Sequence, residues 1–263
     1  MKRIQQFFWI AAMSSISLTA TASVEVVGSL KHKYSCSPGD VLTGEIQIQN
    51  SDDTQQEVKI YQTDLLYNFE NLTMYDEEES HQRSNRQWIK FSPQTVILQA
   101  QEVRYIQFEI SVPPKDSICG TYWSILMVEG VTPIDTTNSS DLNITTITRY
   151  AIQMITEAAD RGEGLLEFMK PILIQEGQNL VLAVDILNKG ERYISAGVSL
   201  ELYDEDGNSV KKINTSAKGL FPTTSARFIL DLAGLKSDHT YQCLIVAAGK
   251  DEDVFGLEYT LYL

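Results

Sequence analysis

Apolar and polar residues alternate in short runs along most of the chain, and Gly, Pro, Asn and Asp separate the runs. In the segment 42–48, Leu42, Ile46 and Ile48 fall on one face. The same alternation recurs in three later segments, whose apolar faces are formed by Ile106, Phe108, Ile110 and Val112, by Leu180, Leu182, Val184 and Ile186, and by Ala226, Phe228, Leu230 and Leu232. A period of two is typical of a strand with one solvated face, whereas an amphipathic helix repeats every ~3.6 residues. The pattern therefore predicts an all-β fold of many short strands.

The two halves of the chain share one spacing. Gly39 begins a run that ends at Asn50, and Gly177 begins a run that ends at Asn188, so the stride is eleven residues in both halves. Each half also has a Thr-Tyr pair that opens a later apolar run, at 121–122 and at 240–241. Two tandem immunoglobulin-like β-sandwiches explain this repeat better than one large barrel. Both tyrosines suit the position from which such domains bond a hydroxyl to the preceding corner.

The chain is expected to have four parts. Residues 1–22 have a basic start, an apolar run and small residues at their end, which is typical of a cleaved signal peptide. The first sandwich is predicted at 23–157, a linker of small and charged residues at 158–164, and the second sandwich at 165–263. A signal peptide indicates an exported bacterial protein, located in the periplasm or at the cell surface.

The charge of the chain restricts its partners. The sequence has 21 basic and 35 acidic residues, giving a formal net charge of −14. This charge repels nucleic acid phosphates, so no nucleic-acid partner is expected. After residue 22 no segment approaches the ~18 apolar residues of a membrane-spanning helix. We therefore expect no integral membrane segment in the mature chain.

Three cysteines, Cys36, Cys119 and Cys243, occur in the chain. An exported location permits a disulfide, and an odd number leaves one thiol over. Cys36 and Cys119 each precede a predicted strand, and in an immunoglobulin-like topology the two turns lie at the same end of the sandwich. A Cys36–Cys119 disulfide is therefore predicted. Cys243 has no partner on the facing strand and is expected to be a small buried apolar side chain.

No group of residues indicates catalysis or metal binding. The three histidines, at 32, 81 and 239, lack the spacing of metal ligands. No nucleophile, zinc or phosphate-binding motif occurs. The segment Asp204–Asn208 lacks the length and the closing Glu of an EF-hand loop, so it predicts a hairpin turn with Gly207 at the positive-φ position. We expect no enzyme activity, no metal and no cofactor.

A predicted edge strand is one surface suited to recognition. The polar loop Val131–Asn143 leads into a long strand predicted at Ile144–Ile155. Such an edge can accept a partner strand through its unpaired amides and carbonyls. Thr146 and Thr148 lie on this edge and are candidate binding residues.

An acidic stretch of the first domain is a second such surface. The segment Asn68–Gln87 is poor in apolar residues and is interpreted as an inserted loop, with aromatic residues in and around it. Aromatic side chains in an exposed loop can anchor a ligand. Trp88, at the end of the stretch, is either such an anchor or a cap on the core.

The first domain, over residues 24–157, resembles two exported families. The resemblance rests on the order of five short motifs: Ser37-Pro-Gly-Asp40, Ile46-Gln-Ile-Gln-Asn50, Trp88 to Pro93, Val112-Pro113 and Gly120-Thr-Tyr122. One family is the peptidoglycan-binding domain of bacterial WxL-interacting surface proteins, and the other is the N-terminal domain of periplasmic pilus chaperones. The second domain is similar to a generic bacterial immunoglobulin-like module.

The chaperone resemblance implies a pair of domains that lends its last first-domain strand to an unfolded fibre subunit. It also implies a basic pair that anchors the terminal carboxylate of the subunit, and Lys33 and Arg149 are the counterparts in this sequence. We expect a non-enzymatic, chaperone-like or assembly-associated protein that binds a fibre or surface subunit. The alternative is an adhesin-type module that binds a cell-wall polymer or surface glycan.

Overall fold

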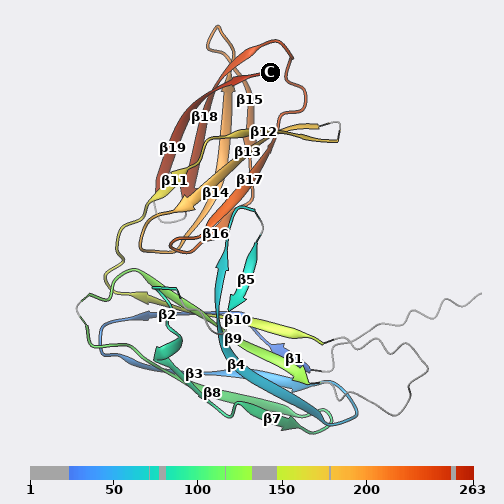
Figure 1. The fold of residues 1–263 in the computed structure, drawn as a ribbon, viewed down its shortest axis with the longest axis vertical. Coiled ribbons are helices and arrows are strands. Elements are labelled where there is room, and N and C mark those ends of the chain that lie inside the picture. Colours follow the sequence, from blue (N-terminus) through green and yellow to red (C-terminus); the bar gives the residue numbers. More distant parts are fainter. Residues whose placement is uncertain are drawn as a thin grey trace, which may run out of the picture.

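The computed structural model describes residues 24–70, 72–76, 81–115, 117–131, 147–177, 179–249 and 253–263. The predicted signal peptide and almost all of the loop 131–143 lie outside these residues. Within the described part, the chain forms β-strands and a single short 3-10 helix, arranged in two β-sandwiches (Figure 1). The prediction of an all-β fold with two tandem immunoglobulin-like sandwiches is confirmed.

The first sandwich consists of two facing sheets. One has the order β1 (Val24–Val27), β3 (Val41–Asn50), β8 (Val103–Ser111) and β6 (Ile89–Ser92). The other has the order β2 (Lys31–Cys36), β10 (Arg149–Ala158), β9 (Thr121–Val131), β4 (Gln56–Tyr67) and β5 (Thr73–Asp76), with β7 (Thr95–Leu98) beside the start of β4. The 3-10 helix η1 (Arg86–Trp88) precedes β6.

The N-terminal segment of the described chain changes sheet between β1 and β2. β1 pairs with β3 in an antiparallel manner, and after the turn at Gly28 the chain continues as β2, which runs parallel to β10. One stretch of chain thus borders both sheets. As a result, β2 covers β10 over only part of its length.

The second sandwich repeats this two-layer plan. Its first sheet consists of β11 (Leu166–Phe168), β12 (Ile172–Glu176), β13 (Asn179–Asn188) and β17 (Ser225–Asp231). β11 and β12 pair with successive parts of one edge of β13, because β17 occupies the other edge. The second sheet has the order β15 (Ser209–Asn214), β14 (Ile194–Tyr203), β18 (Thr240–Gly249) and β19 (Val254–Tyr262), with β16 (Lys218–Leu220) also on β14.

Each sandwich has its own core, formed by the faces that the alternation predicts. Ile106, Phe108, Ile110 and Val112 are buried in the first core, as are Leu182, Val184, Ile186, Ala226, Phe228, Leu230 and Leu232 in the second. Leu42 and Leu180 are only partly buried, because they lie near strand ends. No helix of the described residues is both long and apolar enough to cross a membrane.

The repeated Gly-to-Asn stride corresponds to a repeated structure. Gly39 and Gly177 have positive φ angles of 87° and 63°, a conformation that favours glycine, and each lies in the turn before the strand. Asn50 and Asn188 end β3 and β13 and are fully buried. The second tyrosine corner is also confirmed, because the Tyr241 hydroxyl accepts a bond from the Lys236 amide at 3.0 Å.

One hairpin turn and one tryptophan test two local predictions. Asp204–Asn208 forms the hairpin turn between β14 and β15, with Gly207 at φ 80°. Trp88 is buried in the first core and packs on Tyr122, with ring centroids 4.6 Å apart. Its interpretation as a core cap is confirmed, and its role as an exposed binding anchor is wrong.

The predicted Cys36–Cys119 disulfide is wrong for this structure, in which both cysteines are free thiols. Cys36 is buried in the first core, whereas the Cys119 sulfur lies 3.3 Å from the Glu191 carboxylate of the second domain. The two side chains therefore have different surroundings, although their turns lie at the same end. Cys243 is a free, buried core residue, as expected.

Candidate functional site: an open strand edge and the trough beside it

The first four residues of β10 form an open sheet edge. Arg149–Ile152 pair with β9 on one side, while β2 joins the other side only at Lys31, opposite Gln153. The Gln153 amide donates to the Leu30 carbonyl at 2.8 Å, which marks where that coverage begins. Among the described residues, no strand pairs with Arg149–Ile152 on this side. Peptide groups on such an edge can hydrogen-bond to an added strand.

Local sequence fixes which side chains of β10 lie beside this edge. Ile152 and Met154 point into the core and are fully buried. Arg149, Ala151 and Gln153 therefore lie on the outer face of the sheet, because neighbouring side chains of a strand alternate. Ala151 is small, which leaves a hollow in the sheet surface between its larger neighbours.

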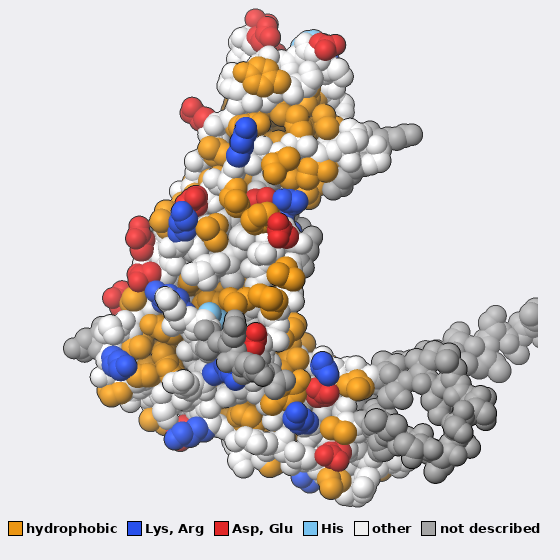
Figure 2. Space-filling model, in the orientation of Figure 1, with side chains coloured by type: hydrophobic (Ala, Val, Ile, Leu, Met, Phe, Trp, Pro, Cys, Tyr) orange, Lys and Arg blue, Asp and Glu red, His pale blue; other side chains and the backbone are white. Residues whose placement is uncertain are grey.

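Two adjoining cavities form a trough over this outer face. Their volumes are about 620 and 250 Å³, and both are lined by Tyr75 and Ala151. The trough begins at Arg149 and ends at the second domain, where Phe221 and Tyr193 close it. Its aromatic residues are Tyr61, Tyr67, Tyr75, Tyr193 and Phe221. Figure 2 shows apolar side chains gathered where the two sandwiches meet.

Basic groups lie at both ends of the trough. Lys31 Nζ lies 3.1 Å from the Tyr193 hydroxyl and 4.2 Å from its ring centroid. At the other end, Arg149 pairs with Glu129 at 2.9 Å, and the Tyr61 hydroxyl donates to the same carboxylate at 2.8 Å. Both basic groups thus already have partners in the protein.

The closed end of the trough is part of the contact between the domains. Trp123 of β9 stacks on Phe221 with ring centroids 4.6 Å apart, and Leu65 and Ile125 are buried in the same cluster. The Tyr67 hydroxyl donates to the Gly219 carbonyl at 2.7 Å. Burial is the main cause that raises the pKa of Tyr67, so this hydroxyl stays protonated near neutral pH. Residues of the second domain therefore form the closed end of the trough, which otherwise lies on the first domain.

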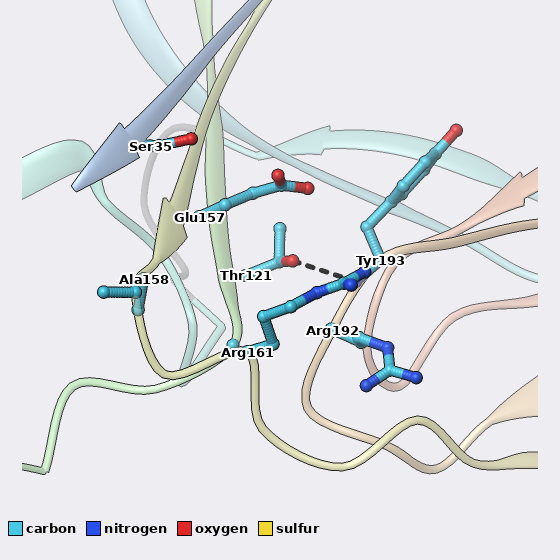
Figure 3. A pocket seen from close by; sticks show the side chains of 9 residues that line it. Ser35, Thr121, Glu157, Ala158, Arg161, Arg192 and Tyr193 are labelled. Carbon is cyan, nitrogen blue, oxygen red and sulfur yellow. Dashed lines mark hydrogen bonds between the residues drawn. The ribbon is translucent and has the colours of Figure 1, made fainter. Parts of the chain in front are cut away.

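A separate cavity of about 280 Å³ lies at the hinge between the sandwiches (Figure 3). Figure 3 shows Glu157, Thr121 and Arg161 converging on it. Thr121 Oγ1 accepts a bond from the Tyr193 amide at 2.9 Å, and Glu157 pairs with Lys33 at 2.7 Å. The cavity contains charges of both signs, and the described residues hold no cluster of His, Cys, Asp or Glu suited to a metal.

The structure separates the predicted anchor residues. Lys33 lies opposite Ile155, while Arg149 is six residues away along β10. At about 3.3 Å per residue these positions are roughly 20 Å apart, so the two side chains do not meet at one carboxylate. Thr148 immediately precedes the open edge, and Thr146 lies outside the described residues.

The predicted strand Ile144–Ile155 overlaps β10, which spans Arg149–Ala158, while residues 144–146 lie outside the described part of the chain. Because β2 covers β10 from Gln153 onward, the open edge ends at Ile152 rather than at Ile155. Sequence reasoning missed this coverage, because the β2–β10 pairing joins segments more than 100 residues apart. It also missed Tyr193 and Phe221, whose place in the trough depends on how the two domains meet.

Comparisons with known proteins support the fold. No family model and no curated protein match this sequence. Among solved structures, the chain is similar to a chain of the chaperone–tip adhesin complex of CFA/I fimbriae biogenesis, with 15% identity, a TM-score of 0.52 and coverage of 91% of this chain and 98% of the other. It is also similar to the class 5 fimbriae chaperone CfaA, with 13% identity, a TM-score of 0.50 and coverage of 91% and 99%. The chain thus has the two-domain, immunoglobulin-like fold of fimbrial chaperones.

Proposed function

We propose that this protein is a non-enzymatic, chaperone-like binder of the bacterial envelope that takes up an extended segment of a fibre or surface subunit along Arg149–Ile152. The observation that carries the proposal is the open edge of β10, which ends where β2 begins. An added strand there would continue the line of β2 and could hydrogen-bond along the side of β10 that β2 leaves uncovered. The fold similarity to fimbrial chaperones agrees with this role.

The trough gives the proposed site a means of selection. Its rings and the hollow at Ala151 suit bulky apolar side chains from the partner, which would lose water contact on binding. Main-chain hydrogen bonds at the edge would contribute affinity for any extended chain. Affinity and selectivity would then come from different parts of one surface.

The test is a proline substitution in the edge. The Ala151 amide faces the same side of β10 as the Gln153 amide, which donates to Leu30, because alternate residues of a strand direct their peptide groups to the same edge. Ala151→Pro removes this amide, while Ala151→Ser keeps it and serves as the matched control. In a pull-down from the envelope fraction, Ala151→Pro should lose a subunit that wild type and Ala151→Ser retain. Retention by a folded Ala151→Pro, together with loss in Tyr75→Ala, would instead favour the glycan- or polymer-binding alternative.

A further inference from the structure

A hairpin of the first domain reaches the second domain. β4 and β5 pair over Asp64–Tyr67 and Thr73–Asp76, and their tip approaches the base of the second sandwich (Figure 1). The sequence of this region predicts a solvated acidic loop. Instead, two of its aromatic residues are anchored on the other domain.

The aromatic tip residue, Phe69, lies on a charged socket. The Phe69 amide donates to Ser225 Oγ at 3.1 Å, and the Arg227 guanidinium lies 5.4 Å from the Phe69 ring centroid. A guanidinium at this distance over a ring is attracted by the negative charge of the ring face. The socket therefore recognises the ring itself.

The socket is held rigid from beneath. Arg227 makes two hydrogen bonds of 2.7 Å to the two oxygens of Asp185, whose side chain is only 4% exposed. A planar guanidinium held at two points has little freedom to turn. β13 and β17 supply the two partners from paired positions, so the socket is built into the sheet of the second domain.

A second contact lies lower on the same hairpin. The Tyr67 hydroxyl donates to the Gly219 carbonyl and accepts from the Phe221 amide at 3.3 Å. On the hinge side of the interface, the Glu191 carbonyl accepts from the Thr121 amide at 2.8 Å. The domains are thus joined at the hinge, at the Trp123–Phe221 stack and, at the tip of the hairpin, by Phe69.

We infer that the β4–β5 hairpin is a latch that fixes the angle between the two domains, with Phe69 in the Arg227–Asp185 socket as its tip. The hinge and the Trp123–Phe221 stack leave rotation about the axis that joins them, whereas a contact at a third point away from this axis opposes it. Release of the tip should therefore widen the range of angles without unfolding either sandwich. This inference does not depend on the identity of any partner.

The experiment measures the distance between the domains by fluorescence energy transfer. Dyes are attached at Tyr105→Cys and Val254→Cys, which are 52% and 66% exposed and lie on different domains. All samples carry Cys119→Ser, because Cys119 is the one partly exposed native thiol among the three. Three proteins are compared: the labelled reference, Phe69→Ala and Leu72→Ala. Leu72 is 50% exposed on the same hairpin and is the matched control.

We expect a broader distance distribution in Phe69→Ala and an unchanged one in Leu72→Ala, with the far-ultraviolet circular dichroism of all three proteins alike. Tyr67→Phe combined with Phe69→Ala should broaden it further, since it removes the second contact as well. An unchanged distribution in the folded double variant would overturn the latch. Equal broadening in Leu72→Ala would overturn it too, because the effect would then not come from the socket.

Discussion

At the residue scale, two buried asparagines organise the ends of equivalent strands. Asn50 Nδ2 donates to the carbonyls of Thr54 and Gln99 at 2.8 Å, and Asn188 Nδ2 donates to those of Arg192 and Leu220 at 2.8 and 2.9 Å. The side-chain oxygen of each also accepts from the amide two residues on. One buried amide side chain thus satisfies several peptide groups around the end of each strand. This explains why both copies of the stride end in Asn.

Replacing either asparagine should therefore be costly. Asn50→Ala or Asn188→Ala removes the partner of at least two carbonyls and of an amide, and each of these groups that stays buried without a partner costs about 1–3 kcal/mol. Urea denaturation should show a lower midpoint for each variant. Asn179→Ala, at an exposed position where β13 begins, is the control and should change the midpoint little. Midpoints that match wild type in both buried variants would contradict this account of the strand ends.

Thiol reactivity tests the three cysteines separately. Burial raises the pKa of Cys243 to about 11, so at pH 8 only roughly one molecule in a thousand would carry the reactive thiolate there. Native protein in a thiol assay should react first at the partly exposed Cys119, and unreduced protein in denaturant should give three thiols. A count of one thiol per molecule in denaturant would show instead that Cys36 and Cys119 form the predicted disulfide.

His81 gives the fold a pH dependence. Its ring stacks on Trp123 with centroids 3.9 Å apart, and burial is the main cause that lowers its pKa from 6.5. The folded state therefore binds this proton more weakly than the unfolded state, so stability falls as the pH drops through and below about 6.5. Urea midpoints between pH 7.5 and 5.5 should fall less in His81→Gln than in wild type. If the urea midpoint changed equally with pH in both proteins, His81 would not be the cause of this pH dependence. His239→Gln, at an exposed position, is the control and should behave as wild type.

At the element scale, the strands were predictable because their signal is local. An alternation over seven residues is visible in the sequence wherever one face is buried, as in β8 and β17. The limits of the open edge could not be predicted from the sequence, because they depend on β2 pairing with a strand from the far end of the same domain. The hairpin β4–β5 was missed for a similar reason: its aromatic residues pack on another domain, and a short polar stretch carries no sign of that.

Close packing between strands requires a glycine in β3. A Cβ at Gly44 would lie 2.5 Å from Phe108 Cζ and 2.7 Å from the Tyr34 hydroxyl. Gly44→Ala must therefore displace an aromatic ring in the first core, with an expected loss of about 1–3 kcal/mol in unfolding free energy. Gly256→Ala in β19, where the nearest atom would be 3.9 Å away, is the control. Equal urea midpoints for Gly44→Ala and Gly256→Ala would contradict this, because they would show that the aromatic rings move aside at no cost in stability.

At the scale of the whole molecule, the two sandwiches form one surface that neither has alone. The open edge and most of the trough belong to the first domain, while Tyr193 and Phe221 close the trough from the second. The repeat and the all-β class follow from the sequence, whereas this junction depends on contacts between residues about 100 or more positions apart. The angle between the domains therefore determines the shape of the proposed binding site.

Hydrogen exchange of the free protein and of its complex with the co-purified envelope partner tests the role of the β10 edge most directly. Because the partner would hydrogen-bond to this edge, exchange over residues 148–152 should slow in the complex, while β19, an edge strand of the second domain, should exchange as before. Unchanged exchange over 148–152, with slowing confined to other surfaces, would contradict the account.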